Sequence, residues 1–132
     1  MTPRTFEVTQ IGVVESTLVD PGAAPKQGTE GGPEAWLVFD ASVTDALADL
    51  AVGDRIIVLT WLDRADRRVL RVHPRDDPAN PERGVFGTRS ADRPNPIGLH
   101  PVEILELRGT RIRVRDLEAV DGTPIVDVKP VL

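Results

Sequence analysis

The stretch Arg55-Ile56-Ile57-Val58-Leu59-Thr60-Trp61-Leu62 is the longest run of apolar and β-favouring residues in this chain. Its β-branched and aromatic residues favour a strand, and the lack of alternating polar residues predicts that both faces of the strand are buried. The charged segment Asp63-Arg64-Ala65-Asp66-Arg67-Arg68 follows at once. The run therefore predicts a central strand of a β fold that ends abruptly in a charged turn.

Shorter strand patterns lie on both sides of this central strand. The pattern nearest the start of the chain is interrupted at Thr9-Gln10, which predicts a bulge. Two later patterns flank Arg108-Gly109 and predict a hairpin, on which Arg111, Arg113 and Arg115 are expected to face solvent. The predicted strands cover residues 6–14, 35–39, 69–73, 99–107 and 110–114.

Only one helix is expected, and it is short. Asp40 with Ser42 is suited to cap a helix of one to three turns that runs to Leu50 and ends at Gly53. Residues 20–34 contain too many glycines and prolines for a helix or a central strand, so they predict a long loop that is either functional or simply solvated. Because strands outnumber helices, we expect a mainly β chain: a small antiparallel or mixed β-barrel with one short helix and long loops.

The composition limits the class of protein. Residues 1–132 fit one domain, and a formal net charge of −5 argues against nucleic-acid binding by overall positive charge. The chain has no cysteine and no clustered histidines, so neither disulfides nor a metal site is expected. No apolar run approaches the roughly 20 residues of a membrane span, and no apolar leader is present, so a cytoplasmic protein is expected.

The segment Gly84–Gly98, GVFGTRSADRPNPIG, concentrates conformationally special residues. Each proline fixes one backbone angle, removes one N–H donor and keeps the preceding residue out of helical conformation. The segment therefore predicts a rigid loop that carries Arg89 and Arg93, and a guanidinium on a rigid loop suits an anionic ligand. The sequence leaves open whether Arg93-Pro94 or Asn95-Pro96 is a cis peptide.

A second special segment lies near the end of the chain. Asp121-Gly122 predicts a turn, and Thr123-Pro124 leads out of it into a strand. The carboxylates of Glu118, Asp121 and Asp127 gather close to this turn and are opposite in sign to the arginines of the 84–98 loop. A ligand of mixed charge would use both segments.

These segments resemble the TsaA-like family, also called the YaeB family. Gly84–Gly98 is similar to the family signature Gly-(Ala/Val)-Phe-x-x-Arg-Ser-x-x-Arg-Pro-Asn-Pro-Ile-Gly, and the segments Ile11–Ser16, Pro25–Gly28 and Asp121–Pro130 are similar too. The resemblance implies a small β-barrel that works as a homodimer and holds S-adenosyl-L-methionine near its interface. It also implies metal-independent methyl transfer to the exocyclic nitrogen of a hypermodified adenosine beside the tRNA anticodon.

The resemblance also implies a set of cofactor-binding residues, all at strand ends or in loops. A guanidinium would hold the methionyl carboxylate, and carboxylates or carbonyls would lie near the sulfonium. Asp63 and Asp127 are candidates for the base that accepts the amine proton. Carried over by position, the cofactor contacts are Pro25, Lys26, Gln27, Asp63, Arg64, Arg89, Leu99, Glu118, Ala119, Val120 and Asp121.

The methyl acceptor stays open between tRNA and a small molecule, and a non-catalytic binding module for S-adenosylmethionine is a third possibility. Family members that act on tRNA often carry an aromatic residue after the Lys-Pro pair, where this chain has Val131, and its aromatic content is only 4%. Few bases could therefore stack on it. A continuous surface formed by residues 64–71 and 111–115 of a dimer would favour tRNA, whereas scattered arginines would favour a small-molecule acceptor or the binding module.

Overall fold

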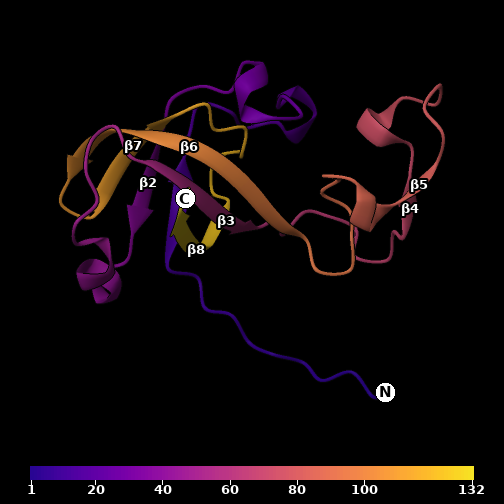
Figure 1. The fold of residues 1–132 in the computed structure, drawn as a ribbon, viewed down its shortest axis with the longest axis horizontal. Coiled ribbons are helices and arrows are strands. Elements are labelled where there is room, and N and C mark those ends of the chain that lie inside the picture. The colour runs from indigo at the N-terminus through magenta and orange to yellow at the C-terminus, as the bar shows by residue number, and fades with distance from the viewer.

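The computed structural model describes residues 1–132 and shows a closed barrel of six strands, all paired antiparallel (Figure 1). Around the barrel the order is β1-β2-β7-β6-β3-β8. The strands are β1 (Gly12–Glu15), β2 (Ala35–Phe39), β3 (Arg55–Trp61), β6 (Ile97–Arg108), β7 (Arg111–Arg115) and β8 (Pro124–Pro130). The expected mainly β barrel is confirmed.

The central strand β3 shows how the barrel buries its core. Successive side chains of a strand point to opposite faces, so Ile56, Val58 and Thr60 lie buried inside while Ile57 and Leu59 are half-buried outside. The prediction that both faces are buried is therefore wrong, because no helix covers the outside of β3. The core combines inward residues of the strands with two from the 116–123 segment: Val14, Ala35, Leu37, Phe39, Ile56, Val58, Val102, Ile104, Ile112, Val114, Leu117, Ala119 and Ile125.

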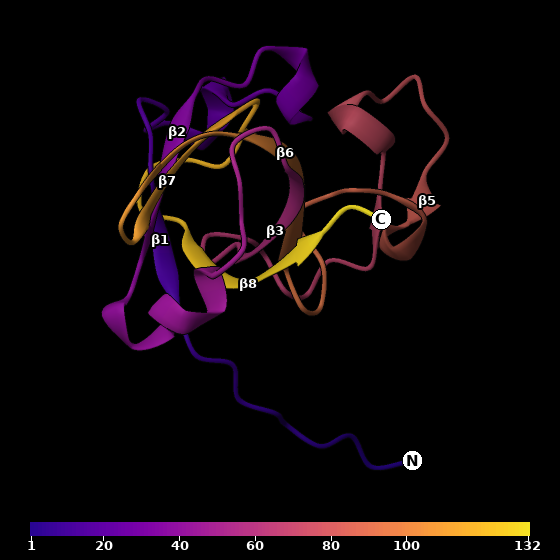
Figure 2. The same cartoon turned by 60° about the vertical axis from the view of Figure 1, so that its left-hand side comes forward.

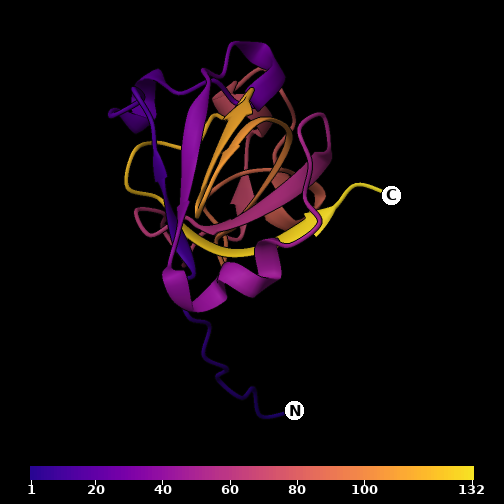
Figure 3. The same ribbon diagram turned by 90° about the vertical axis from the view of Figure 1, so that its left-hand side faces the viewer.

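The strand directions gather the three long connections at one end of the barrel, which we call the loop end. Because every pairing is antiparallel, β1, β3 and β7 finish at the end where β2, β6 and β8 begin. The segments 16–34, 62–96 and 116–123 therefore all leave and re-enter the barrel there. Figure 3 shows the 16–34 loop and the short helix η3 (Ala41–Leu47) at opposite ends of the barrel.

Residues 62–96 form an extension that stands beside the barrel (Figure 1). It contains a ribbon of two very short strands, β4 (Arg71–Val72) and β5 (Arg83–Gly84), with the 3-10 helices η4 (Pro74–Asp76) and η5 (Val85–Gly87). Only residues 71–72 of the predicted strand 69–73 are paired. All peptide bonds of the chain are trans, those before Pro94 and Pro96 included.

Two further expectations need correction in detail. The short helix is present and Asp40 caps it by accepting the backbone N–H of Ser42 at 2.8 Å, but it is a 3-10 helix that ends at Leu47. The first strand begins only at Gly12, because Phe6 and Val8 find no apolar surface and stay 73% and 63% exposed. None of the helices has the length and apolar character that crossing a membrane requires.

Candidate functional site

The two arginines of the 84–98 loop have different environments. The Arg93 guanidinium donates to three backbone carbonyls of its own loop, those of Ser90 at 2.7 Å, Val85 at 2.8 Å and Thr88 at 2.6 Å. Arg89 is exposed and makes no ion pair or side-chain hydrogen bond. Arg93 therefore stabilises the loop, and Arg89 is the guanidinium that the loop presents to a ligand.

The charged turn after β3 is fastened to this loop. Arg67 lies over the Trp61 ring, 5.2 Å from its centroid, and donates to the Pro94 carbonyl at 2.7 Å and to the Asn95 side chain at 3.0 Å. The Asp92 carboxylate accepts the backbone N–H of residue 66 at 2.8 Å. These contacts hold the turn and the loop together, so Asp63 and Arg64, both exposed, lie on the same extension as Arg89.

Asp66 has its own partner within the turn. The side chain of Arg68 donates to the Asp66 carboxylate, as does the backbone N–H of the same residue, and these hydrogen bonds hold the pKa of Asp66 below its usual value. Asp66 is therefore a structural carboxylate of the turn, whereas the exposed Asp63 side chain has no hydrogen-bond or ion-pair partner.

The long loop between β1 and β2 packs against the segment that joins β7 and β8. At Gly28 a Cβ atom would lie 1.7 Å from the Asp116 carbonyl oxygen and 2.9 Å from Glu118 Oε2, so only glycine permits this approach. Leu117 donates its backbone N–H to the Pro33 carbonyl at 3.2 Å. The loop that carries Pro25, Lys26 and Gln27 is thereby held beside Glu118.

The same loop also reaches the extension. Lys26 pairs with Asp76, and Arg75 donates to Glu30 at 2.7 Å. Figure 2 shows the corresponding elements, η2 (Gly28–Glu30) at the top of the barrel and η4 on the extension, on facing sides. Because Asp76 neutralises the Lys26 ammonium, the loop contributes less free positive charge to the site than the sequence suggests.

A buried polar chain leads from the barrel interior to Glu118. His100 on β6 is only 4% exposed, and its Nε2 lies 2.7 Å from the Thr60 hydroxyl on β3. Its Nδ1 lies 2.6 Å from Glu118 Oε1. A carboxylate only accepts, so Nδ1 carries the proton and donates. Glu118 is the member of the carboxylate-rich segment that is held most firmly.

The rest of that segment is mainly structural. The Asp121 carboxylate accepts the Ser16 backbone N–H at 3.0 Å, and the Thr123 hydroxyl donates to the Val120 carbonyl at 2.7 Å. Ala119 is a core residue. Asp121 also lines a surface hollow of about 420 Å³ on the barrel wall. These contacts hold the turn that follows Glu118 against the barrel.

Leu99 and Asp127 lie on the outside of the barrel. In the sheet register Leu59 pairs with Leu99 on one side and with Asp127 on the other, so the three side chains share the outer face. Asp127 is exposed, with Lys129 Nζ at 3.7 Å. Both residues are thus separated by the barrel wall from His100, which points inward.

The structure therefore brings the predicted cofactor residues to the loop end in two groups. One group is Pro25, Lys26 and Gln27 with Glu118, and the other is Asp63, Arg64 and Arg89 on the extension. Sequence reasoning did not connect His100 and Thr60 to Glu118. The signal was present, because alternation along β6 puts His100 on the inner face with Val102, where a polar ring needs partners.

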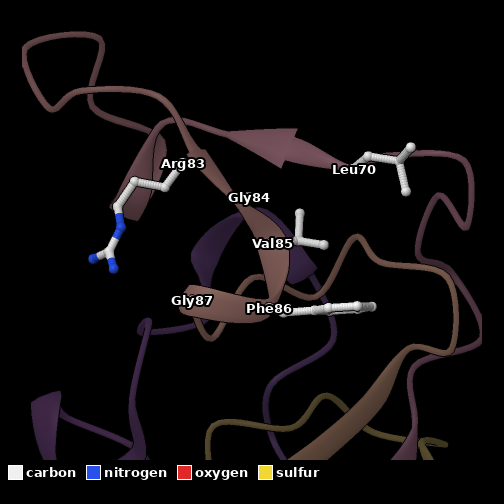
Figure 4. Close-up of a pocket in the computed structure, with 6 residues that line it drawn as sticks. All are labelled: Leu70, Arg83, Gly84, Val85, Phe86 and Gly87. Atoms are coloured by element: carbon white, nitrogen blue, oxygen red, sulfur yellow. The ribbon is translucent and has the colours of Figure 1, made fainter.

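The extension carries an apolar hollow of about 340 Å³ that the sequence did not predict. Its lining includes the apolar side chains of Leu70, Val85 and Phe86 together with Arg83, whose side chain extends from the ribbon in a different direction from that of Leu70 (Figure 4). Phe86 is 83% exposed and Leu70 64%. Phe86 belongs to the 84–98 motif, and its ring is a large exposed apolar group that no other part of this chain covers.

The arginines of β7 do not form a free basic surface. Arg111 pairs with Glu15 at 2.9 Å, which raises the pKa of the Arg111 guanidinium through the hydrogen bond. Arg113 pairs with Glu34 at 3.0 Å, and Arg115 pairs with a carboxylate of β6. In one chain β7 lies on the side of the barrel away from the extension (Figure 1).

Comparison with known protein families identifies the family of this chain. The model of the tRNA-methyltransferase O (TrmO) N-terminal domain matches residues 13–132. The chain belongs to this family. TrmO from Pseudomonas aeruginosa has the same fold in its crystal structure, with a TM-score of 0.77 and 26% sequence identity over 98% of this chain and 57% of that one.

Curated relatives of the TrmO N-terminal domain family carry related names. A probable S-adenosyl-L-methionine-binding protein of Methanothermobacter thermautotrophicus is 42% identical, covering 98% of this chain and 93% of the relative. Another of Archaeoglobus fulgidus is 43% identical over 94% of this chain but only 33% of its own length. The chain thus spans little more than half of the solved TrmO chain and a third of one curated relative.

Proposed function

We propose that this chain binds S-adenosyl-L-methionine and transfers its methyl group to a nucleoside of tRNA. The observation that carries the proposal is the difference between the two arginines of the 84–98 loop. Arg93 donates to three backbone carbonyls, whereas Arg89 is exposed and has no partner. A free guanidinium on a clamped loop is suited to a carboxylate such as that of the methionyl group. Membership of the TrmO N-terminal domain family and the names of the relatives support this ligand.

The residues at the loop end fit the chemistry of this cofactor. Arg89 would hold the carboxylate, and Glu118 would face the sulfonium. Pro25, Lys26 and Gln27 would contact the ligand from the 16–34 loop. When bound, the cofactor supplies a methyl group on a positively charged sulfur.

Methyl transfer requires positioning and the removal of one proton. With the cofactor bound, this chain would hold the acceptor nitrogen in line with the methyl group that the cofactor supplies, and a carboxylate would accept the amine proton. Asp63 and Asp127 are the two candidates. Asp63 is exposed on the extension that also carries Arg89, whereas Asp127 lies on the outer barrel face beside Lys129.

The tRNA acceptor has its support in the family rather than in the surface charge. The matching family is named for the N-terminal domain of a tRNA methyltransferase. The sequence resemblance further implies that the acceptor would be the hypermodified adenosine beside the anticodon. The paired arginines of β7 favour a second candidate, an S-adenosylmethionine-binding module without tRNA methylation. Several relatives are named only as binding proteins.

We also propose that the active form is a homodimer. Ile97 and Leu99 on the outer face of β6 are 48% and 39% exposed, and Phe86 is exposed on the extension. Ile97 and Leu99 lie two residues apart on one face of the strand, and neighbouring exposed apolar side chains are typical of an interface. Analytical ultracentrifugation at micromolar concentration tests this, and a monomer would contradict it.

Two measurements test the proposed function. Calorimetric titration with S-adenosyl-L-methionine should show binding. The same ligand should raise the melting temperature in thermal unfolding, because a ligand that binds only the folded chain stabilises it. Incubation with radiolabelled cofactor and total tRNA from a strain that lacks this protein should then yield a new methylated adenosine by nucleoside mass spectrometry. Binding without methylation would favour the second candidate, and no binding would reject both.

A further inference from the structure

The Thr60–His100–Glu118 chain is the most deeply buried polar feature of the molecule that the proposed function leaves unexplained. Both ring nitrogens of His100 are engaged, one to each neighbour, at 2.7 and 2.6 Å. The side chains of His100 and Glu118 are only 5% and 17% exposed. Removing such groups from water is costly, so their retention in the barrel calls for a reason beyond packing.

The charge of Glu118 is not balanced by any lysine or arginine. Its side-chain partner is the His100 imidazole, whereas most other glutamates, including Glu15, Glu34 and Glu82, pair with an arginine. A largely buried carboxylate with no lysine or arginine beside it attracts a positively charged ligand strongly, because charges interact more strongly away from water.

The geometry also shows where that charge is directed. Oε1 of Glu118 accepts from His100, and Oε2 lies on the side of Gly28, where a Cβ atom would be only 2.9 Å away. Gly28 ends the Pro25-Lys26-Gln27 segment, and its close approach to the Asp116 carbonyl holds that segment against residues 116–118. The histidine therefore fixes one oxygen and leaves the other facing the loop.

We propose that His100 is a positioning residue, supported by Thr60, that orients the Glu118 carboxylate toward the 25–28 loop so that the site selects a sulfonium cation over a neutral thioether. This inference rests on the proposed function. It adds that the site distinguishes S-adenosylmethionine from S-adenosylhomocysteine by charge. Such a preference would favour release of the product after the methyl group has left.

The first test is Glu118→Gln, which keeps the shape and an acceptor oxygen for His100 but removes the negative charge. The dissociation constants of both ligands are measured by calorimetry. Because interactions with a charged group contribute roughly 10- to 100-fold in affinity, S-adenosylmethionine should bind at least about tenfold more weakly. S-adenosylhomocysteine, which has no charge on sulfur, should change by less than about threefold.

A matched pair of substitutions tests the role of His100 itself. The amide nitrogen of His100→Asn takes the place of Nδ1 and keeps the donor to Glu118, whereas that of His100→Gln takes the place of Nε2 and keeps only the Thr60 partner. The asparagine variant should retain the preference for the sulfonium and the glutamine variant should lose most of it. A merely structural histidine would not produce this difference.

Val102→Ala is the control for lost stability. Val102 lies two residues along β6 on the same inner face and is 1% exposed, so its truncation should lower the melting temperature without changing the ratio of the two dissociation constants. If His100→Gln fails to fold, the ratio in Glu118→Gln still decides whether the site selects by charge, and His100→Asn, which should keep the wild-type ratio, tests the donor to Glu118.

The outcomes separate the inference from the function on which it rests. If wild-type protein binds both ligands and Glu118→Gln weakens both equally, the selectivity inference is overturned while cofactor binding stands. Equal ratios in the asparagine and glutamine variants would overturn the positioning role of His100. Failure of the wild-type protein to bind either ligand would overturn both proposals.

Discussion

Substitution of the two motif arginines should separate stability from binding, because only one of the two side chains holds the loop together. Arg93→Ala removes three hydrogen bonds to the carbonyls of Val85, Thr88 and Ser90, all between 2.6 and 2.8 Å. At this half-buried position water replaces part of each bond, so a net contribution of about 1 kcal/mol each is reasonable. The expected loss is about 3 kcal/mol of unfolding free energy, or roughly 10 °C in melting temperature.

Arg89→Ala is the matched variant. Arg89 is exposed and has no partner in the chain, so its removal should change the unfolding free energy by less than about 0.5 kcal/mol. If it binds the methionyl carboxylate, affinity for S-adenosyl-L-methionine should fall by about 1.5–3 kcal/mol. Arg93→Ala weakens binding as well, because the loop that presents Arg89 is no longer clamped.

Urea unfolding followed by circular dichroism gives the stability of each variant, and calorimetry gives the affinity. The reasoning is refuted if Arg89→Ala is as destabilised as Arg93→Ala. It is also refuted if the unfolding free energy of Arg93→Ala equals that of the wild-type protein. Unchanged affinity in Arg89→Ala would reject its role in ligand binding while leaving the role of Arg93 intact.

Three further predictions concern the loop, the acid side of the pH range and the start of the chain. In Gly28→Ala the new Cβ atom would lie 1.7 Å from a backbone oxygen, so this substitution should cost about 1–3 kcal/mol of stability and weaken cofactor binding. In the control Gly22→Ala the new Cβ atom would lie 3.3 Å from a flexible carboxylate, so both stability and binding should be nearly unchanged in the same two assays. Hydrogen bonds lower the folded-state pKa of Asp40 and Asp66 from 3.8, so their stabilisation is present above that pH and is lost as the pH falls through the folded values. Replacing both by asparagine should therefore reduce the difference in urea midpoint between pH 6 and pH 3, and an unchanged difference would contradict it. Deletion of residues 1–10, all exposed, should change the unfolding free energy by less than about 0.5 kcal/mol, and a larger loss would show contacts that the barrel does not display.

Local sequence signals predicted the strands with some systematic errors. The 99–107 and 110–114 hairpin is confirmed because Gly109, with φ of +60°, permits the tight turn between β6 and β7. The 6–14 pattern failed over its first half because a strand needs a neighbour to pair with and a surface to cover, and only residues from Ile11 onward have both. Propensity describes what a segment favours and not whether a partner is available.

The candidate site was only partly readable from the sequence. The 84–98 segment was recognisable, but its two arginines have the same chemistry, and only the fold shows that Arg93 bonds backbone carbonyls while Arg89 does not. Lys26 was expected as a cofactor contact, and nothing in the sequence indicated that it pairs with Asp76, 50 residues away. Contacts at such separations depend on how the loops close and not on any local pattern.

The sequence by itself determined the fold class, the rigid loop and the family, because alternation, glycine and proline placement and a long motif are local properties. Only the tertiary structure decided where these pieces meet. Antiparallel closure of six strands brings the connections 16–34, 62–96 and 116–123 to one end of the barrel. It also joins Thr60, His100 and Glu118 into one buried chain, since inward-facing residues of neighbouring strands must share a small interior in which each polar group needs a partner.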